Sequence, residues 1–288
     1  MHGFVTVTGM LRRWLVFILV SVACGIGHAA ERLFDFGAMP EGKVPTNFTS
    51  VVTGIGAPGD WRVVPGELPA TLQPLTPNAP KAGRGLVLAQ LSTDATEERF
   101  PVLIFDGEVF GDFTFSTKFK CVDGKSEQMA GLAFRYQDPK NYYVLRASAL
   151  GNNVRFYKFV NGVRSDPLGP EALIPRGTWH ELSVECKGNQ IRCLLDGREL
   201  LPPLTDNSFA FGKLGFWTKS DSVSHFTDAK VTFTPRETLA RAFVRELFER
   251  KSSVVSATIY LKELQGPGTR VVASRNEKLI GQAGGDVE

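Results

Sequence analysis

Two arginines in the stretch GLAFRYQDPKNYYVLRA (131–147) are the residues best suited to contact a ligand. Arg135 and Arg146 alternate with apolar residues, and the polar loop between them divides the stretch into two predicted strands. A guanidinium group donates paired hydrogen bonds to carboxylates, and aromatic rings offer flat apolar surfaces with a polar edge. These residue types fit the recognition of sugar hydroxyls, acidic sugars or carboxylates.

The register of this predicted hairpin decides on which side of the sheet the two arginines lie. If Tyr136 pairs with Tyr143, the apolar residues of both strands share one buried face. A shift by one residue would place Arg146 in the core as an unpaired charge, which sheets avoid. We therefore expect Arg135 and Arg146 to be diagonal neighbours on the face away from the core.

The next strand and a later one extend this outer face. Matching the third strand to the hairpin puts Tyr157 and Phe159 inside. Phe156 and Lys158 then lie outside, beside Arg146. In GFWTK, Trp217 also points away from the core. The predicted ligand-binding patch consists of Arg135, Tyr142, Arg146, Phe156, Lys158 and Trp217. The alternative is an ordinary solvated outer face, or aromatic residues covered by another segment of the chain.

Residues for catalysis are scarce. Sugar-cleaving enzymes hold two carboxyl groups at a fixed separation, and the nearest pattern, Asp106-Gly107-Glu108, contains a glycine typical of a turn. The sequence has no HExxH, GxSxG or phosphate-loop motif, and beyond the N-terminal segment only His180 and His225 could be near-neutral bases. We predict binding without catalysis; if the protein is an enzyme, a sugar hydrolase is expected.

The elements that must position these residues are strands. Turn signals such as Asn161-Gly162 separate segments without helical periodicity, which predicts an all-β, two-sheet antiparallel jelly-roll sandwich. The 21 phenylalanines suit the space between two facing sheets. A Pro- and Gly-rich stretch, 53–84, is expected to be a loop across one end. The predicted strands span 85–91, 100–105, 112–122, 129–136, 141–149, 154–160, 178–186, 191–195, 213–219 and 226–233.

Both ends of the chain differ from this pattern. Arg12 and Arg13 precede a short apolar run, and small residues follow up to Ala30, which predicts a signal peptide over 1–30. The protein is therefore expected to be exported, periplasmic or extracellular, with no stable membrane span after cleavage. After a sandwich domain over 31–235, the segment 236–288 is expected to contain a helix (235–251) and two strands (254–261 and 269–274).

The charge and the cysteines exclude some classes of protein. The formal net charge is only +3, so a nucleic-acid partner is not expected. Beyond the signal segment, three cysteines remain: Cys121, Cys186 and Cys193. A two-residue turn at 188–189 would pair Cys186 with Ile191 and leave Cys193 diagonal, which favours free buried thiols over a disulfide, although a longer loop would bring the two opposite each other.

The order of several motifs resembles the concanavalin A-like lectin/glucanase superfamily, in particular its secreted bacterial laminin-G-like and 3-keto-disaccharide-hydrolase-like domains. The motifs are GLAFRYQDPKNYY, RFYKFVNG, GTWHELSVECKG, LLDGREL and GKLGFWTKSDSVSHFTDAKV, within 32–234. The resemblance implies the sandwich fold and a carbohydrate or other small extracellular ligand, but not one activity, because the superfamily contains lectins, glycosidases and adhesive modules. A hydrolase like the 3-keto-disaccharide hydrolases is the alternative function.

Two further expectations come from resemblance. Sandwiches of this superfamily often carry one structural calcium ion, for which Asp35 and Asp228 are the candidate oxygen ligands; no other cofactor is expected. The stretch TRVVASRNEKLIGQAGG (269–285) is similar to the start of Cache-type sensor domains. This likeness implies, as a second alternative, a truncated extracellular sensor or adhesion ectodomain.

Overall fold

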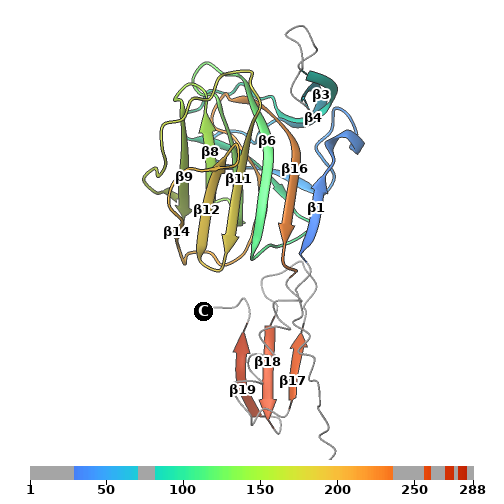
Figure 1. The fold of residues 1–288 in the computed structure, drawn as a ribbon, viewed down its shortest axis with the longest axis vertical. Coiled ribbons are helices and arrows are strands. Elements are labelled where there is room, and N and C mark those ends of the chain that lie inside the picture. The colour runs from blue at the N-terminus through green and yellow to red at the C-terminus, as the bar shows by residue number, and fades with distance from the viewer. Residues whose placement is uncertain (1–28, 71–81, 236–255, 261–269, 276–277, 284–288) are drawn as a thin grey trace, which may run out of the picture.

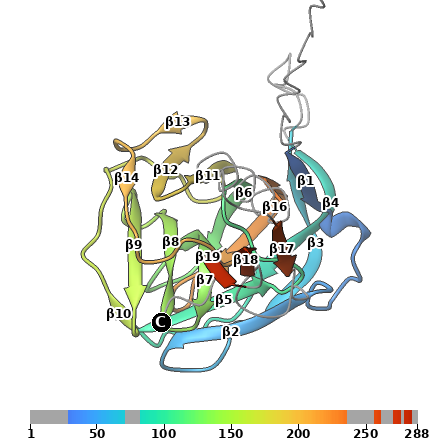
Figure 2. The same ribbon diagram turned by 90° about the horizontal axis from the view of Figure 1, so that it is seen from below.

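The computed structural model describes residues 29–70, 82–235, 256–260, 270–275 and 278–283. Two antiparallel sheets face each other as a β-sandwich, as Figures 1 and 2 show from the side and from below. The nine-stranded sheet has the order β13-β12-β11-β6-β16-β4-β3, with β1 beside β16 and β14 beside β12. The seven-stranded sheet has the order β10-β9-β8-β7-β15-β5-β2. The predicted all-β sandwich is confirmed.

The strands of the nine-stranded sheet are β1 (Ala30–Phe34), β3 (Trp61–Pro69), β4 (Ala82–Gln90), β6 (Phe113–Asp123), β11 (His180–Lys187), β12 (Gln190–Leu195), β13 (Arg198–Glu199), β14 (Leu204–Thr205) and β16 (Val223–Phe233). Those of the seven-stranded sheet are β2 (Phe48–Gly54), β5 (Arg99–Phe105), β7 (Met129–Asp138), β8 (Asn141–Ser148), β9 (Asn153–Val160), β10 (Val163–Arg164) and β15 (Lys213–Trp217). All ten predicted strands are present, with ends shifted by a few residues.

The expected loop over 53–84 is wrong in part, because β3 occupies Trp61–Pro69 and pairs with β4. Its proline and glycine are tolerated because β3 is the last strand of its sheet, where one row of backbone groups needs no ladder partner. Composition therefore gave a misleading signal for an edge strand.

The core between the sheets is built from the phenylalanines that alternate along the strands. Phe216 of β15 packs on Phe115 of β6 and Phe226 of β16, with ring centroids 5.9 and 5.1 Å apart. Phe113 meets Phe134 of β7 at 6.4 Å. Each such side chain contributes roughly 1.5–3 kcal/mol through its burial. The alternation that sends these rings inward sends the intervening residues to the two outer faces.

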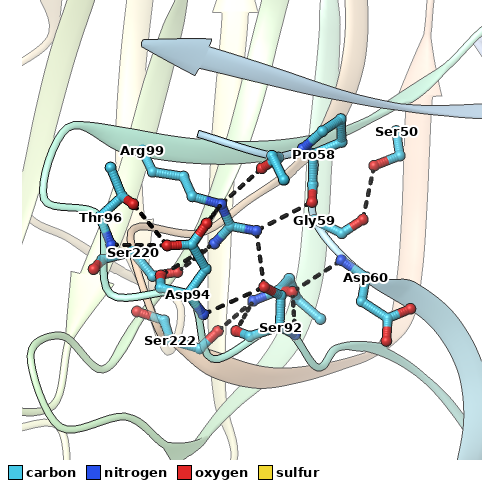
Figure 3. A network of polar contacts seen from close by, with 12 residues as sticks. Ser50, Pro58, Gly59, Asp60, Ser92, Asp94, Thr96, Arg99, Ser220 and Ser222 are labelled. Carbon is cyan, nitrogen blue, oxygen red and sulfur yellow. Dashed lines mark hydrogen bonds and ion pairs between the residues drawn. The ribbon is translucent and has the colours of Figure 1, made fainter. Parts of the chain in front are cut away.

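Loops at one end of the sandwich are tied together by Arg99, at the start of β5 (Figure 3). Its fully buried guanidinium donates hydrogen bonds to the backbone carbonyls of Ala57 (2.7 Å), Pro58 (3.1 Å) and Ser220 (2.7 Å), and it forms an ion pair with Asp94 at 3.3 Å. Desolvation lowers the pKa of Arg99, and Asp94 opposes this effect. Arg99 thereby joins three chain segments that are distant in sequence.

The C-terminal part forms a separate three-stranded antiparallel sheet of β17 (Ser256–Tyr260), β18 (Arg270–Arg275) and β19 (Lys278–Ala283). The first two correspond to predicted strands, and β19 was not predicted. The expected helix and signal peptide lie outside the described residues. Within the described residues, no helix is long and apolar enough to span a bilayer. The cysteines Cys121, Cys186 and Cys193 are buried and free, and Cys186 pairs with Ile191 as expected.

Candidate functional site

The outer face of the seven-stranded sheet is curved, and aromatic rings from distant strands meet on it. Phe100 of β5 and Phe159 of β9 have ring centroids 5.4 Å apart, although three strands separate them in the sheet. Neighbouring strands are spaced about 4.8 Å apart, so a flat sheet would hold these strands roughly 19 Å from each other. The rings can meet only because the sheet curves with this face on the inside. We call this surface the concave face.

Contacts between distant strands close one end of the concave face. The guanidinium carbon of Arg164, on β10, lies 5.3 Å from the centre of the Phe100 ring. The hydroxyl of Thr53, on β2, donates a 2.7 Å hydrogen bond to the carbonyl of Pro139 in the β7–β8 loop. Each edge strand of the sheet is therefore linked by a side chain to a strand or loop that is not its neighbour in the sheet.

Aromatic rings form the floor of the concave face. Tyr142 stacks on Phe159 with ring centroids 4.7 Å apart, and Trp217 stacks on Phe100 at 5.6 Å. All four rings are at most 2% exposed. Tyr142 and Trp217 lie on the outer face, as predicted, but they form a second apolar cluster rather than a free platform.

Arg146 lies on the concave face beside this cluster, as predicted for its side of the sheet. One terminal nitrogen donates to the side-chain oxygen of Asn153, and the other donates to the Tyr157 hydroxyl at 3.0 Å. Arg146 is only 6% exposed, and no carboxylate of the described residues lies within 4.0 Å of its nitrogens. Desolvation lowers its pKa, and the Tyr157 hydroxyl opposes this effect. Arg146 is thus a desolvated cation held by neutral side chains.

Tyr157 is the centre of the polar part of this site. Its ring centre lies 5.5 Å from the guanidinium carbon of Arg146 and 5.3 Å from that of Arg164. Arg164 also approaches Glu98 at 3.7 Å, with both side chains partly exposed. Lys219 pairs with Glu127 at 2.8 Å beyond the ends of β15 and β7. The site therefore combines two guanidinium groups and a phenol ring at the rim of an aromatic floor.

The predicted position of Arg135 is wrong. Phe134 pairs with Tyr143, and a bulge follows in which Arg135 has a φ of 47°. This left-handed conformation interrupts the alternation of side chains. Tyr136 consequently joins the outer aromatic cluster, while the Arg135 guanidinium reaches between the sheets and donates to the carbonyls of Phe209 (2.8 Å) and Gly188 (2.5 Å). Arg135 and Arg146 are therefore not neighbours on one face.

The local cause of the bulge is visible on the adjacent strand. A Cβ atom on Gly212, which precedes β15, would lie 2.2 Å from the carbonyl carbon of Arg135. Only a glycine permits this close approach. The register itself is shifted by two residues from the predicted one, since Phe134 rather than Tyr136 faces Tyr143. A shift of two preserves the faces, which explains why Arg146 was placed correctly.

Phe156 and Lys158 are also on the other side from the one predicted. Phe156 pairs with Leu145 and belongs to the core between the sheets, whereas Arg155 is the direct neighbour of Arg146. The pattern NVRFYKFV was ambiguous, because either face of β9 would carry one basic residue. The structure resolves this ambiguity. Lys158 lies at the margin of the core between the sheets, where it pairs with Asp206 at 2.6 Å.

The Lys158 cluster anchors a loop. The Tyr143 hydroxyl and the Lys158 ammonium group both donate to the carboxylate of Asp206. Desolvation raises the pKa of Asp206, but these hydrogen bonds outweigh it and hold the pKa below its ordinary value. The hydroxyl of Tyr143 also accepts from the backbone N–H of Phe209 at 3.2 Å. Lys158 is therefore engaged by the loop that follows β14.

Sequence reasoning missed four residues of the site, namely Phe100, Tyr157, Phe159 and Arg164. Phe100 and Arg164 lie on β5 and β10, which are not neighbours in the sheet. The alternation of side chains along each strand cannot predict their contact, because that contact depends on the curvature of the sheet. Tyr157 was assigned to the core because of the wrong choice of face for β9. Its polar tip next to two basic residues at 155 and 158 was the available signal.

Five described carboxyl groups have a shifted pKa, and in all five the pKa is lowered. Hydrogen bonds from neighbouring donors lower the pKa of Glu67, Asp94 and Glu199, and in Asp206 and Asp221 they outweigh desolvation. A general acid for glycoside cleavage needs a raised pKa. These five groups are therefore unsuited to that role.

The two candidate calcium ligands have local partners. Asp35 accepts the backbone N–H of Gly37 at 2.9 Å, and Asp228 pairs with the ammonium group of Lys118 at 2.7 Å. The pairing of Phe34 with Ala229 brings Asp35 and Asp228 to neighbouring positions. The described residues contain no group of three or more His, Cys, Asp or Glu side chains that could hold a metal ion. The calcium site stays a prediction.

Comparisons with known proteins give partial similarities. A segment of 105 residues, 36% of this chain, is 30% identical to the levanase of Bacillus subtilis (strain 168), of which it spans 15%. Among solved structures, the carbohydrate-binding module CBM66 from Bacillus subtilis is 21% identical with a TM-score of 0.44, covering 59% of this chain and 94% of that one. A Bacillus subtilis protein of unknown function with a galectin-like fold is 14% identical with a TM-score of 0.39, covering 60% and 89%. No protein-family model matches the chain.

Proposed function

We propose that this protein is an exported carbohydrate-binding β-sandwich, of the concanavalin A-like type, that holds a glycan on its concave face without cleaving it. The observation that carries the proposal is Arg146, a desolvated guanidinium on the concave face whose hydrogen-bond partners are the side-chain amide of Asn153 and the phenol of Tyr157. A buried cation with neutral partners gains from additional acceptors, and sugar hydroxyls supply them.

The surrounding residues fit a sugar ring. Tyr157 offers a partly exposed aromatic ring beside Arg146, and its hydroxyl can both donate and accept. Arg164 brings a second set of donors to the same ring. The stacked rings of Phe100 and Trp217, which are part of the aromatic floor, help to fix the sheet curvature that brings Arg146, Tyr157 and Arg164 together. Tyr142 supports the floor, and we assign no direct ligand contact to Arg135, Phe156 or Lys158.

One further argument supports a carbohydrate as the ligand. A segment of this chain is similar to part of a protein named levanase. A hydrolase resembling the 3-keto-disaccharide hydrolases is the alternative, and its sign would be release of sugar by the purified protein.

The test is a glycan array, followed by isothermal titration calorimetry with the best ligand and with levan. We expect Arg146→Met to weaken binding at least about tenfold, since a charged hydrogen bond contributes about 1.5–3 kcal/mol. The matched control is Arg192→Met, because Arg192 lies on the nine-stranded sheet and pairs with Glu185 and Glu199. Equal loss in both variants, or no binding to any glycan, would contradict the proposal.

A further inference from the structure

We propose that the glycan bound on the concave face is acidic and that Arg146 receives the carboxylate of a uronic acid residue. This inference rests on the proposed function and adds the charge of the ligand to it. Its basis is a comparison of the buried arginines in the described part of the chain, which are Arg99, Arg135 and Arg146.

The first two buried arginines are held mainly by backbone carbonyls of the protein, although the Nε of Arg135 has no hydrogen-bond partner among the described residues. Arg99 has an ion pair with Asp94, four carbonyl acceptors and the Ser92 hydroxyl as a further acceptor. Arg135 has no described carboxylate within 4.0 Å, but the carbonyls of Gly188 and Phe209 lie at both ends of its guanidinium. Fixed backbone dipoles of this kind compensate a buried charge.

Arg146 has a weaker set of partners. Its good hydrogen bonds go to the Asn153 side chain and the Tyr157 hydroxyl, and the Asn153 carbonyl lies at 3.5 Å. Its Nε makes no hydrogen bond to a described residue. A guanidinium edge with a free N–H and no counter-ion matches a carboxylate, which can accept two hydrogen bonds side by side.

The charges near Arg146 come from both signs of side chain. The carboxylate of Glu127 acts on the Arg146 guanidinium and is itself paired with Lys219 at 2.8 Å. Arg155, the cross-strand neighbour of Arg146, donates to the carbonyls of Gly169 and Pro170 and pairs with Glu171, whose side chain is 72% exposed. Among the described residues, the carboxylate paired with Arg164 is Glu98 at 3.7 Å, so a second carboxylate along an acidic chain can compete for Arg164. Two guanidinium groups on one phenol ring would suit successive acidic residues of a polymer.

The experiment compares oligogalacturonate with the same oligosaccharide after its carboxyl groups have been reduced to alcohols. Isothermal titration calorimetry at about 20 mM and 500 mM NaCl separates charge from shape, since salt screens exposed ionic contacts. We expect the acidic form to bind at least about tenfold more tightly at low salt, and this preference to shrink at high salt. Oligoglucuronate and its reduced form serve as a second pair in case the sugar stereochemistry matters.

Two variants assign the preference to residues. Arg146→Met should remove the preference for the acidic form, and Arg164→Gln, at a partly exposed position, should reduce it without affecting the fold. The melting temperature of each variant shows whether it is folded. If reduced and acidic forms bind equally, or neutral glycans bind while both acidic oligosaccharides do not, this inference is overturned and the proposed function stands. If no glycan of any kind binds, the proposed function fails as well.

Discussion

Arg99 and Arg146 are both nearly inaccessible to solvent, yet their surroundings differ in kind. Arg99 sits where three loops meet and is held by backbone carbonyls and Asp94 (Figure 3). Arg146 sits on the concave face and is held by the side chains of Asn153 and Tyr157. Carbonyls within packed loops cannot turn away without disturbing the fold, whereas side chains can adjust to a ligand. The kind of acceptor, rather than the degree of burial, separates a structural arginine from a candidate ligand contact.

The largest effect is expected at Arg99. Arg99→Met should lower the free energy of unfolding by about 3–5 kcal/mol, because it leaves four carbonyls, the Ser92 hydroxyl and the Asp94 carboxylate without their shared donor. Urea denaturation followed by tryptophan fluorescence measures this. The control is Arg62→Met, since Arg62 forms an exposed pair with Asp60 and should contribute less than about 1 kcal/mol. Similar losses of stability in both variants would contradict the conclusion that Arg99 is a structural arginine.

His225, a partly buried basic group, has neither kind of partner at its Nδ1. Its Nδ1 makes no hydrogen bond to the described residues, and desolvation together with the neighbouring Lys120 lowers its pKa to about 4. The unfolded chain, with an ordinary histidine pKa of about 6.5, binds more protons between these values. Stability should therefore fall as the pH drops from about 6.5 to about 4.

The variant His225→Gln should remove about 1–3 kcal/mol of this pH-dependent loss. The measurement is the free energy of unfolding at pH 7.5, 5.5 and 4.5 for both proteins, and the value at pH 7.5 separates packing effects from titration. If both proteins lose stability equally as the pH falls, His225 is solvated. It would then not be an example of a basic side chain that is partly buried without a hydrogen-bond partner.

The smallest effect on stability is expected at Arg146. Arg146→Met should change the free energy of unfolding by less than about 1 kcal/mol, because replacing a poorly paired buried charge by an apolar side chain of similar length is often neutral. The same substitution abolishes most of the glycan binding under the proposed function. A loss as large as that of Arg99→Met would show that Arg146 is a structural residue, and the contrast between the two arginines would disappear.

The sequence by itself determined the positions of the main strands and the outward direction of Arg146 and Trp217. Alternation of apolar residues is a local property. The cost of burying an unpaired arginine excluded a register shifted by one residue, but it could not exclude the shift by two residues that the structure shows, because that shift keeps the faces. Edge strands such as β3 were harder to predict from the sequence. Proline and glycine are acceptable in β3 because of its position at the edge of the sheet, and the sequence of the segment does not reveal that position.

Only the tertiary structure decided which groups meet at the site. The bulge at Arg135 depends on the approach of Gly212 from another strand, and the inward face of β9 depends on Asp206 as a partner for Lys158. The curvature that brings Arg164 to Phe100 is a property of the whole twisted sheet. Local alternation cannot encode these contacts, because each depends on residues that are far apart in the chain.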